Sequence, residues 1–292
     1  MTAVHLRPGR ADEAAEMLEV MAGALAGEAA SGAIVHAFPD REGEAAWLRY
    51  LLSSGAGWVA ETEGRLAGFG ITARREPIDW LVSLFVRPEA QGRGLGRQLL
   101  EKLWPPAPNE VRATLVDAAS RPATSLYLRA GLTPRFPVLA FDGPLGARPA
   151  SAPTARNDWY ETQPQVAEMD AAAFGSHRPG DHAFWTETGS AYRSLWDADG
   201  VWVGYGRWNP AGRLGPVVLK EGADWPGALA ALADEAARAG AGRPRLLVPA
   251  INAGALEACR RLGLRYQGSE IAMATCPLDG WSRCLIHRAG LP

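Results

Sequence analysis

A glycine-rich turn between an apolar run and a leucine-rich segment constrains the fold most strongly. Residues 80–85 read Trp-Leu-Val-Ser-Leu-Phe, and residues 91–97 read Gln-Gly-Arg-Gly-Leu-Gly-Arg. Leucines then recur at helical spacing over residues 95–103. The pattern predicts a strand, a tight turn and a helix whose first amide groups lack intrahelical partners. Glycines let an anion approach those amides closely, and the helix dipole favours negative charge there. The turn therefore predicts a diphosphate site.

Two common phosphate-binding loops do not fit this turn. A P-loop requires Lys followed by Ser or Thr after its last glycine, and Arg97 and Gln98 stand there instead. A dinucleotide-binding turn requires G-x-G-x-x-G, whereas Gly92, Gly94 and Gly96 are each separated by a single residue. The turn therefore predicts a diphosphate site of a kind other than these two loops.

The turn resembles the coenzyme A site of the GNAT superfamily of N-acyltransferases. The matching signature, Gln/Arg-x-x-Gly-x-Gly/Ala, spans residues 91–96 and follows a hydrophobic-x-Pro turn at residues 86–88. The resemblance implies that acetyl-CoA is the co-substrate, with its pantetheine arm on the backbone of a splayed strand and its diphosphate at the turn. The coenzyme contacts expected from it are Leu84, Phe85, Val86, Gln91, Gly92, Arg93, Gly94, Leu95, Gly96 and Arg97.

A second matching segment follows at residues 120–132, which predict a helix capped by Ser120 and ended by Gly131. GNAT enzymes usually have Asn at the start of this segment, then Tyr, then a Gly-Phe or Gly-Leu ending. The chain keeps Tyr127 and the Gly-Leu ending but has Ser120 in place of Asn. The resemblance implies that Ser120 contacts the coenzyme and that Tyr127 is catalytic, protonating the departing thiolate. The alternative is that Tyr127 is an ordinary half-buried tyrosine.

The function that the resemblance implies is N-acetylation of a primary amine on a small molecule or peptide, by direct attack on the thioester. The amine must lose a proton, and Asp79, Asp117 and Glu61 are the carboxylates available as the base; the sequence does not choose among them. The alternative function is a non-catalytic acyl-CoA sensor, which would bind the coenzyme without releasing its thiol.

Composition narrows the possible partners. The net charge of −2, from 30 basic and 32 acidic residues, creates no field that would recruit nucleic acid or a membrane. No apolar run approaches the roughly 20 residues that span a bilayer, and residues 1–7 do not resemble a signal peptide. Cys259, Cys276 and Cys284 lack metal-type spacing. We expect a cytoplasmic bacterial protein without a metal, monomeric or homodimeric.

The length of 292 residues suits two domains. Residues 1–143 predict the element order β-α-α-β-β-β-α-β-α, which matches the GNAT topology, and residues 144–157 predict a linker rich in Pro, Ala and Gly. The expected fold class is α+β, with two tandem GNAT-like domains that each have a mixed, mostly antiparallel sheet flanked by helices.

An internal repeat predicts the second domain, residues 158–292. Residues 252–264 repeat residues 120–132 at an offset of 132, which places Asn252 on Ser120 and Cys259 on Tyr127. A helix at residues 225–239 stands where the coenzyme helix should begin, but residues 220–224 lack the glycine signature. We therefore expect a degenerate domain that has lost the diphosphate site. Residues 170–178, residues 214–216 and Asn252 resemble the second domain of tandem bacterial acetyltransferases related to YitH.

His177 and His182 lie five residues apart, with Asp181 beside the second. Because no third metal-ligand type stands nearby, we interpret both histidines as polar loop residues.

Overall fold

The structure is a computed structural model that describes residues 4–29, 41–107, 110–144 and 152–288. Its contacts divide the chain into two compact units. Unit 1 comprises Met1–Pro134 with Ile271–Cys276, and unit 2 comprises Arg135–Glu270 with Pro277–Pro292. The bounds of the two units differ from those of the expected domains, residues 1–143 and 158–292. The reason is that each unit includes a strand segment from the other half of the sequence.

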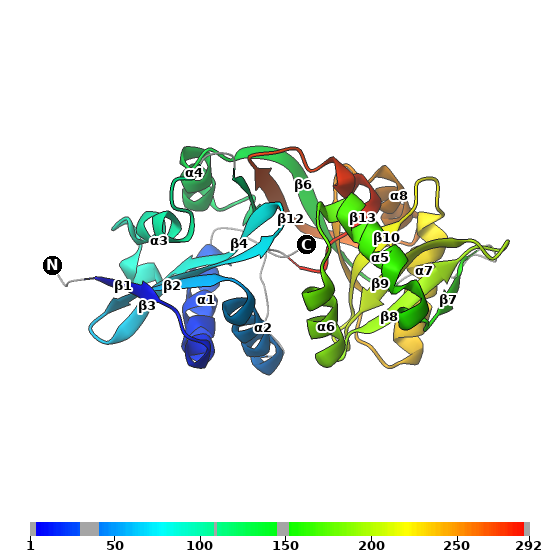
Figure 1. The fold of residues 1–292 in the computed structure, drawn as a ribbon, viewed down its shortest axis with the longest axis horizontal. Helices are drawn as coiled ribbons and strands as arrows, with labels where there is room; N and C mark the ends of the chain where they lie inside the picture. The colour runs from blue at the N-terminus through cyan, green and yellow to red at the C-terminus, as the bar shows by residue number, and fades with distance from the viewer. Residues whose placement is uncertain (1–3, 30–40, 108–109, 145–151, 289–292) are drawn as a thin grey trace. The chain divides into compact units, whose positions relative to one another are not determined.

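Unit 1 follows the element order expected from the sequence. Its elements are β1 (His5–Pro8), η1 (Ala11–Glu13), α1 (Ala14–Ala29), α2 (Arg41–Ser54), β2 (Ala56–Thr62), β3 (Arg65–Arg75), β4 (Ile78–Val86), η2 (Pro88–Ala90), α3 (Leu95–Leu103), β5 (Val111–Asp117) and α4 (Arg121–Arg129). Helices α1 and α2 cover one face of the sheet, and α3 and α4 cover the other (Figure 1).

The sheet of unit 1 runs β1-β2-β3-β4-β5, antiparallel except for the parallel pair β4–β5. Its last strand is the end of β12 (Arg265–Ala274), which arrives from the far end of the sequence. The amide of Thr275 donates to the carbonyl of Arg112 at 2.9 Å, and the amide of Arg112 donates to the Thr275 hydroxyl at 3.0 Å. The sheet of unit 1 is therefore completed by residues more than a hundred positions away in sequence.

Unit 2 contains the remaining elements. These are β6 (Thr133–Asp142), β7 (Thr154–Arg156), α5 (Trp159–Phe174), α6 (Pro179–Glu187), β8 (Ala191–Trp196), β9 (Trp202–Trp208), β10 (Arg213–Leu219), α7 (Trp225–Arg238), β11 (Arg245–Pro249), α8 (Ala253–Arg261), the first part of β12, η3 (Asp279–Arg283) and β13 (Cys284–Leu285). Strand β7 falls within the expected linker, where it pairs with β8.

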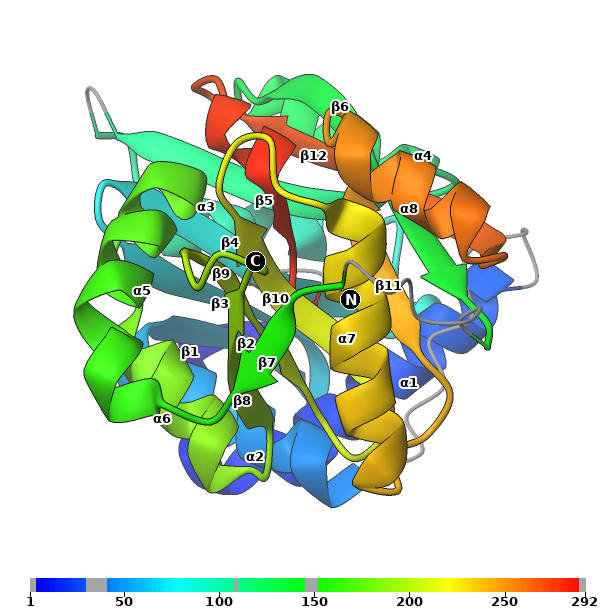
Figure 2. The same ribbon diagram turned by 90° about the vertical axis from the view of Figure 1, so that its right-hand side faces the viewer.

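The sheet of unit 2 runs β6-β11-β10-β9-β8-β7, and β10–β11 is its parallel pair. Helices α5 and α6 lie on one side of the central strands, and α7 and α8 on the other (Figure 2). The order β10-α7-β11-α8 repeats the order β4-α3-β5-α4 of unit 1. Each unit therefore has a mixed sheet flanked by helices, as expected.

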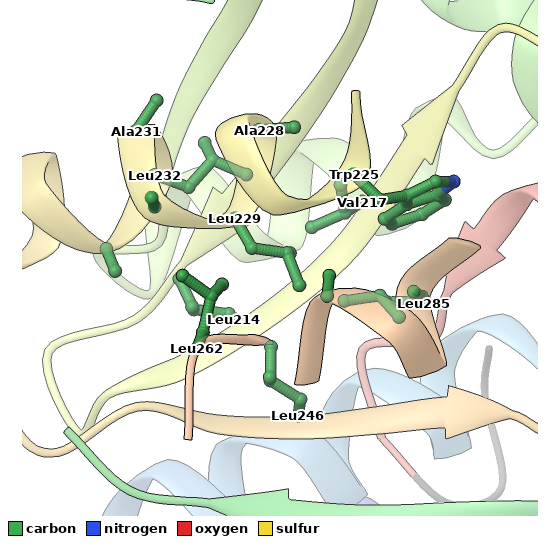
Figure 3. Packing of buried hydrophobic residues seen from close by; sticks show 14 of the residues in the cluster. Leu214, Val217, Trp225, Ala228, Leu229, Ala231, Leu232, Leu246, Leu262 and Leu285 are labelled. Carbon is green, nitrogen blue, oxygen red and sulfur yellow. The ribbon is translucent and has the colours of Figure 1, made fainter. Parts of the chain in front are cut away.

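The core of unit 2 forms where α7 packs on β10 and β11. Leu214, Leu229, Leu232 and Leu246 are buried in one apolar cluster, which Leu285 of β13 joins (Figure 3). Burying a leucine stabilises a fold by about 1.5–3 kcal/mol. Within the described ranges, no helix combines the length and the apolar character needed to cross a bilayer.

Candidate coenzyme site and comparison with known proteins

Strands β4 and β5 separate partway along their length. Their parallel pairing ends at Leu81 and Thr114, after which β4 continues to Val86 and β5 to Asp117. Val82 is an extra residue in β4 relative to β3, and such a bulge bends a strand. The ends of the two strands are therefore not paired with each other, and we call the region between them the slot. Residues 84–86, expected to bind the pantetheine arm, lie on its β4 side.

The predicted glycine-rich turn stands at the end of that slot. Gly92 and Gly94 have φ values of 74° and 78°, which lie in the left-handed region that favours glycine. Gly94 is the N-cap residue of α3, without a side chain to cap it. Gln91 donates from Nε2 to the Val86 carbonyl at 3.0 Å and so ties the turn to β4. The turn thus connects the end of β4 to the start of α3.

Six consecutive amides, those of residues 92–97, have no hydrogen-bond partner within the part of the chain that the structure describes. An added Cβ at Gly92 would meet no atom within 4 Å, and one at Gly96 would make only ordinary contacts, the nearest at 3.7 Å. The protein itself therefore does not require glycine at 96. Free amides with open space before them suit an anion such as a diphosphate.

Charged and apolar side chains complete the turn. Arg93 and Arg97 are exposed, and Arg97 pairs loosely with Glu101 at 3.6 Å, so both guanidinium groups remain available to an anion. Leu95 is buried and anchors the first turn of α3.

Tyr127 lies on α4 with 5% of its surface exposed, so it is more deeply buried than a half-buried tyrosine. It belongs to an apolar cluster with Leu81 and with Met273 from β12, and Leu84 packs against the same cluster. The ring is therefore beside the strand that borders the slot. Ser120 is the N-cap residue of α4, but its side chain makes no capping bond.

The three carboxylates considered as the base have different surroundings. Glu61 accepts a hydrogen bond from Arg7 at 2.9 Å on the β1–β2 edge. Asp117 accepts from the amide of Ala119 at 2.8 Å at the end of β5. Asp79 lies on β4, two residues before Leu81, and burial together with the nearby Glu110 carboxylate raises its pKa. The pKa of Asp79 is thus shifted toward neutral pH.

The structure contradicts the interpretation of His182 as a polar loop residue. It lies in α6, buried in unit 2, with Nε2 2.9 Å from an Asp170 carboxylate oxygen. Arg207 donates from Nε to Nδ1 at 3.1 Å, so the ring carries its proton on Nε2 and is neutral. Burial lowers the pKa of His182 accordingly. Within the described residues, no group of three or more His, Cys, Asp or Glu could hold a metal ion.

Sequence reasoning missed this buried polar cluster. Its centre is Asp170, whose two carboxylate oxygens also accept from Arg178 at 3.0 and 3.2 Å and from Tyr205. The signal in the sequence that could have indicated this cluster is the pair Asp170 and Arg178, eight residues apart on either side of an apolar helix end.

Residues 53–133 match the family model of the acetyltransferase (GNAT) domain, and this range includes the slot, the turn and Tyr127. The matched range lies within unit 1 and covers less than a third of the chain. No curated protein sequence matches the chain.

Solved structures match the fold over nearly the whole chain. A candidate acetyltransferase from Pyrococcus horikoshii has a TM-score of 0.73 at 20% identity, covering 99% of this chain and 97% of that one. A GCN5-related N-acetyltransferase from Sphaerobacter thermophilus has a TM-score of 0.67 at 19% identity, covering 93% and 95%. A tandem GNAT protein from the clavulanic acid biosynthesis pathway has a TM-score of 0.63 at 17% identity, covering 93% and 98%. The chain has the tandem GNAT fold.

Proposed function

We propose that unit 1 transfers the acetyl group of acetyl-CoA to a primary amine of a small molecule or peptide. The observation that carries the proposal is the slot between β4 and β5 leading to the free amides of residues 92–97. The coenzyme needs both features, because its pantetheine arm is extended and its diphosphate is anionic. Leu84, Phe85 and Val86 would bind the arm through backbone groups. Residues 91–97 would bind the diphosphate, beside Ser120 at the start of α4.

The transfer forms a bond between the amine nitrogen and the thioester carbonyl carbon, and it breaks the carbon–sulfur bond. The nitrogen gives up a proton to a base, and the departing thiolate takes a proton from an acid. Tyr127 is the proposed acid because its ring packs in the cluster against which Leu84 lies. Its phenol then regains a proton from solvent.

Asp79 is the proposed base. A carboxylate with a raised pKa is a stronger base than an ordinary one. Glu61 is less suited because Arg7 holds its carboxylate at 2.9 Å. Asp117 keeps one carboxylate oxygen in the hydrogen bond from the Ala119 amide.

The experiment is to incubate the purified chain with acetyl-CoA and a panel of small primary amines and short peptides, and to follow thiol release. Release that depends on one amine, with the acetylated product identified by mass spectrometry, supports the proposal. Tight coenzyme binding without thiol release from any amine contradicts it and favours an acyl-CoA sensor.

A further inference from the structure

Unit 2 contains a counterpart of the coenzyme slot. The parallel pairing of β10 and β11 ends at Leu214 and Leu246, after which the strands diverge. In unit 1 the pairing ends at Leu81 and Thr114, and the internal repeat offset of 132 places Thr114 on Leu246. The two openings therefore begin at equivalent places in the two units.

The opening in unit 2 is filled by the chain itself. Strand β13 lies in it, with Leu285 paired antiparallel to Val217 of β10. On the other side, the amide of Ile286 donates to the carbonyl of Leu247 in β11 at 3.2 Å. An extended segment thus bonds to both of the diverging strands.

The residues that hold β13 are the counterparts of the residues proposed to hold the pantetheine arm. In unit 1, Gly70 pairs with Leu84, and an added Cβ on Gly70 would lie 2.5 Å from a leucine of α3. In unit 2, Gly206 pairs with Val217 and faces a leucine of α7 in the same way. Leu84 is therefore equivalent to Val217, the partner of Leu285.

The diphosphate end of the slot is also closed in unit 2. The carboxylate of Asp224, the N-cap of α7, accepts from the amide of Gly227 at 3.2 Å. A negative charge from the protein therefore already occupies the N-terminus of α7. In addition, Asn252 at the start of α8 donates to the Cys284 carbonyl at 3.0 Å. It thus binds β13 from the position equivalent to Ser120.

Strand β13 is an integral part of the core of unit 2. Cys284, Leu285 and Ile286 are fully buried, and Leu285 packs with Leu214 and Leu246 in the apolar cluster (Figure 3). Its removal would leave that cluster and two strand edges exposed to water. An occupant held in this way does not exchange readily with a ligand from solution.

We infer that β13 is a built-in occupant of the second coenzyme slot, which closes unit 2 to acyl-CoA and leaves unit 1 as the single coenzyme site. The inference rests on the proposed function insofar as unit 1 must bind the coenzyme. The two are nevertheless separable, because the occupancy of the slot by β13 can be measured without any coenzyme.

Hydrogen–deuterium exchange on the full chain, with and without coenzyme A, tests the occupancy. The amides of residues 215, 217–219 and 284–287 should exchange slowly in both samples, whereas the coenzyme should slow exchange only in unit 1, at residues 84–97 and around Ser120. Fast exchange at 284–287 without coenzyme, or a coenzyme-dependent change at 215–219, overturns the inference. Slow exchange at 284–287 with no coenzyme effect at 84–97 counts against the proposed function and leaves the occupant in place.

A substitution next to β13 gives a second test. A Cβ at Gly215 would lie 2.5 Å from the Ile286 carbonyl oxygen, so Gly215→Ala must push β13 away from β10. Gly222→Ala is the matched control, because Gly222 also has a positive φ but has no atom within 4 Å of an added Cβ. We expect Gly215→Ala to speed exchange at residues 284–287 at least tenfold and Gly222→Ala to leave it unchanged. Equal exchange in the two variants overturns the inference. If Gly215→Ala does not fold, Leu285→Ala replaces it with the same expected result.

Discussion

The side-chain amide of Asn252 donates a 3.0 Å hydrogen bond to the carbonyl oxygen of Cys284, which joins the start of α8 to β13. The oxygen of the same side chain accepts from the amide of Ala255 at 2.9 Å and caps the helix. One buried side chain thus satisfies a helix amide and a strand carbonyl, neither of which water can reach.

Asn252→Ala should therefore lower the free energy of unfolding by about 2–3 kcal/mol, because a helix cap and a buried carbonyl both lose their partner. Urea unfolding without coenzyme measures the change. Ser120→Ala is the matched control at the equivalent position of unit 1, where the side chain makes no capping bond; we expect less than about 1 kcal/mol there. Equal losses in the two variants would contradict this account.

Gly94→Glu should weaken coenzyme binding by at least about 100-fold, since a carboxylate at the start of α3 competes with the diphosphate for the free amides. Gly64→Glu is the control for backbone strain, because Gly64 has a φ of 74° in the turn between β2 and β3. It should bind coenzyme as the parent chain does. Calorimetry measures both affinities, and an unchanged affinity in folded Gly94→Glu would place the diphosphate elsewhere.

Tyr127→Phe should lower kcat by about 100-fold while changing coenzyme affinity little, because a general acid acts only in the transition state. Cys259→Ala tests the equivalent position in unit 2, where burial raises the pKa of the thiol to about 12 and keeps it protonated. Its turnover should match that of the parent chain. Steady-state kinetics with coenzyme titration measure both, and an essential Cys259 with a dispensable Tyr127 would move the active site to unit 2.

Asp79→Asn should lower kcat by about 10²–10⁴-fold if Asp79 is the base. In the parent chain, kcat should fall as the pH drops through the raised pKa of Asp79, because a protonated carboxyl cannot accept the amine's proton. The variant should lose this acidic limb of the pH profile. Asp117→Asn serves as the comparison, and if it alone removes the limb, Asp117 is the base.

The stability of the chain should fall as the pH drops below about 6.5, the ordinary pKa of histidine. Burial lowers the pKa of His182, with Arg178 and Arg207 adding to the effect and Asp170 opposing it. The unfolded chain therefore binds a proton at a higher pH than the folded chain does. The stabilisation is complete above pH 6.5 and is lost as the pH falls toward the lower, folded pKa. Urea unfolding between pH 7.5 and 5 should show this slope, and His182→Gln should reduce it; an equal slope in the variant would assign the effect to other groups.

The elements around the candidate coenzyme site could be predicted from local sequence. Glycine at 92 and 94 marks a turn that needs positive φ, and leucine periodicity marks α3. The expected order of elements in unit 1 is confirmed. Residues 84–86 lie at the end of β4, and their contacts with the coenzyme, which a family resemblance implies, stay a prediction.

Elements fixed by distant partners could not be predicted. Strand β13 spans only Cys284 and Leu285, and its position depends on pairing with β10 rather than on any local pattern. The presence of β6 in unit 2 and of the end of β12 in unit 1 likewise depends on long-range pairing. The prediction of a loop at His182 is wrong, because nothing adjacent to it in sequence reveals the buried carboxylate of Asp170 that fixes it.

Because residues 271–276 form the last strand of unit 1, this unit cannot complete its sheet until the ribosome has synthesised them. A ribosome adds about 5–20 residues per second, so the strand follows Pro134 by roughly 7–30 seconds. During that interval the edge of β5 and the apolar side of α4 have no strand to cover them. Unit 1 therefore finishes folding only after residue 276 has been made. A message truncated after Glu270 would yield a product with every predicted coenzyme contact but an unfinished sheet.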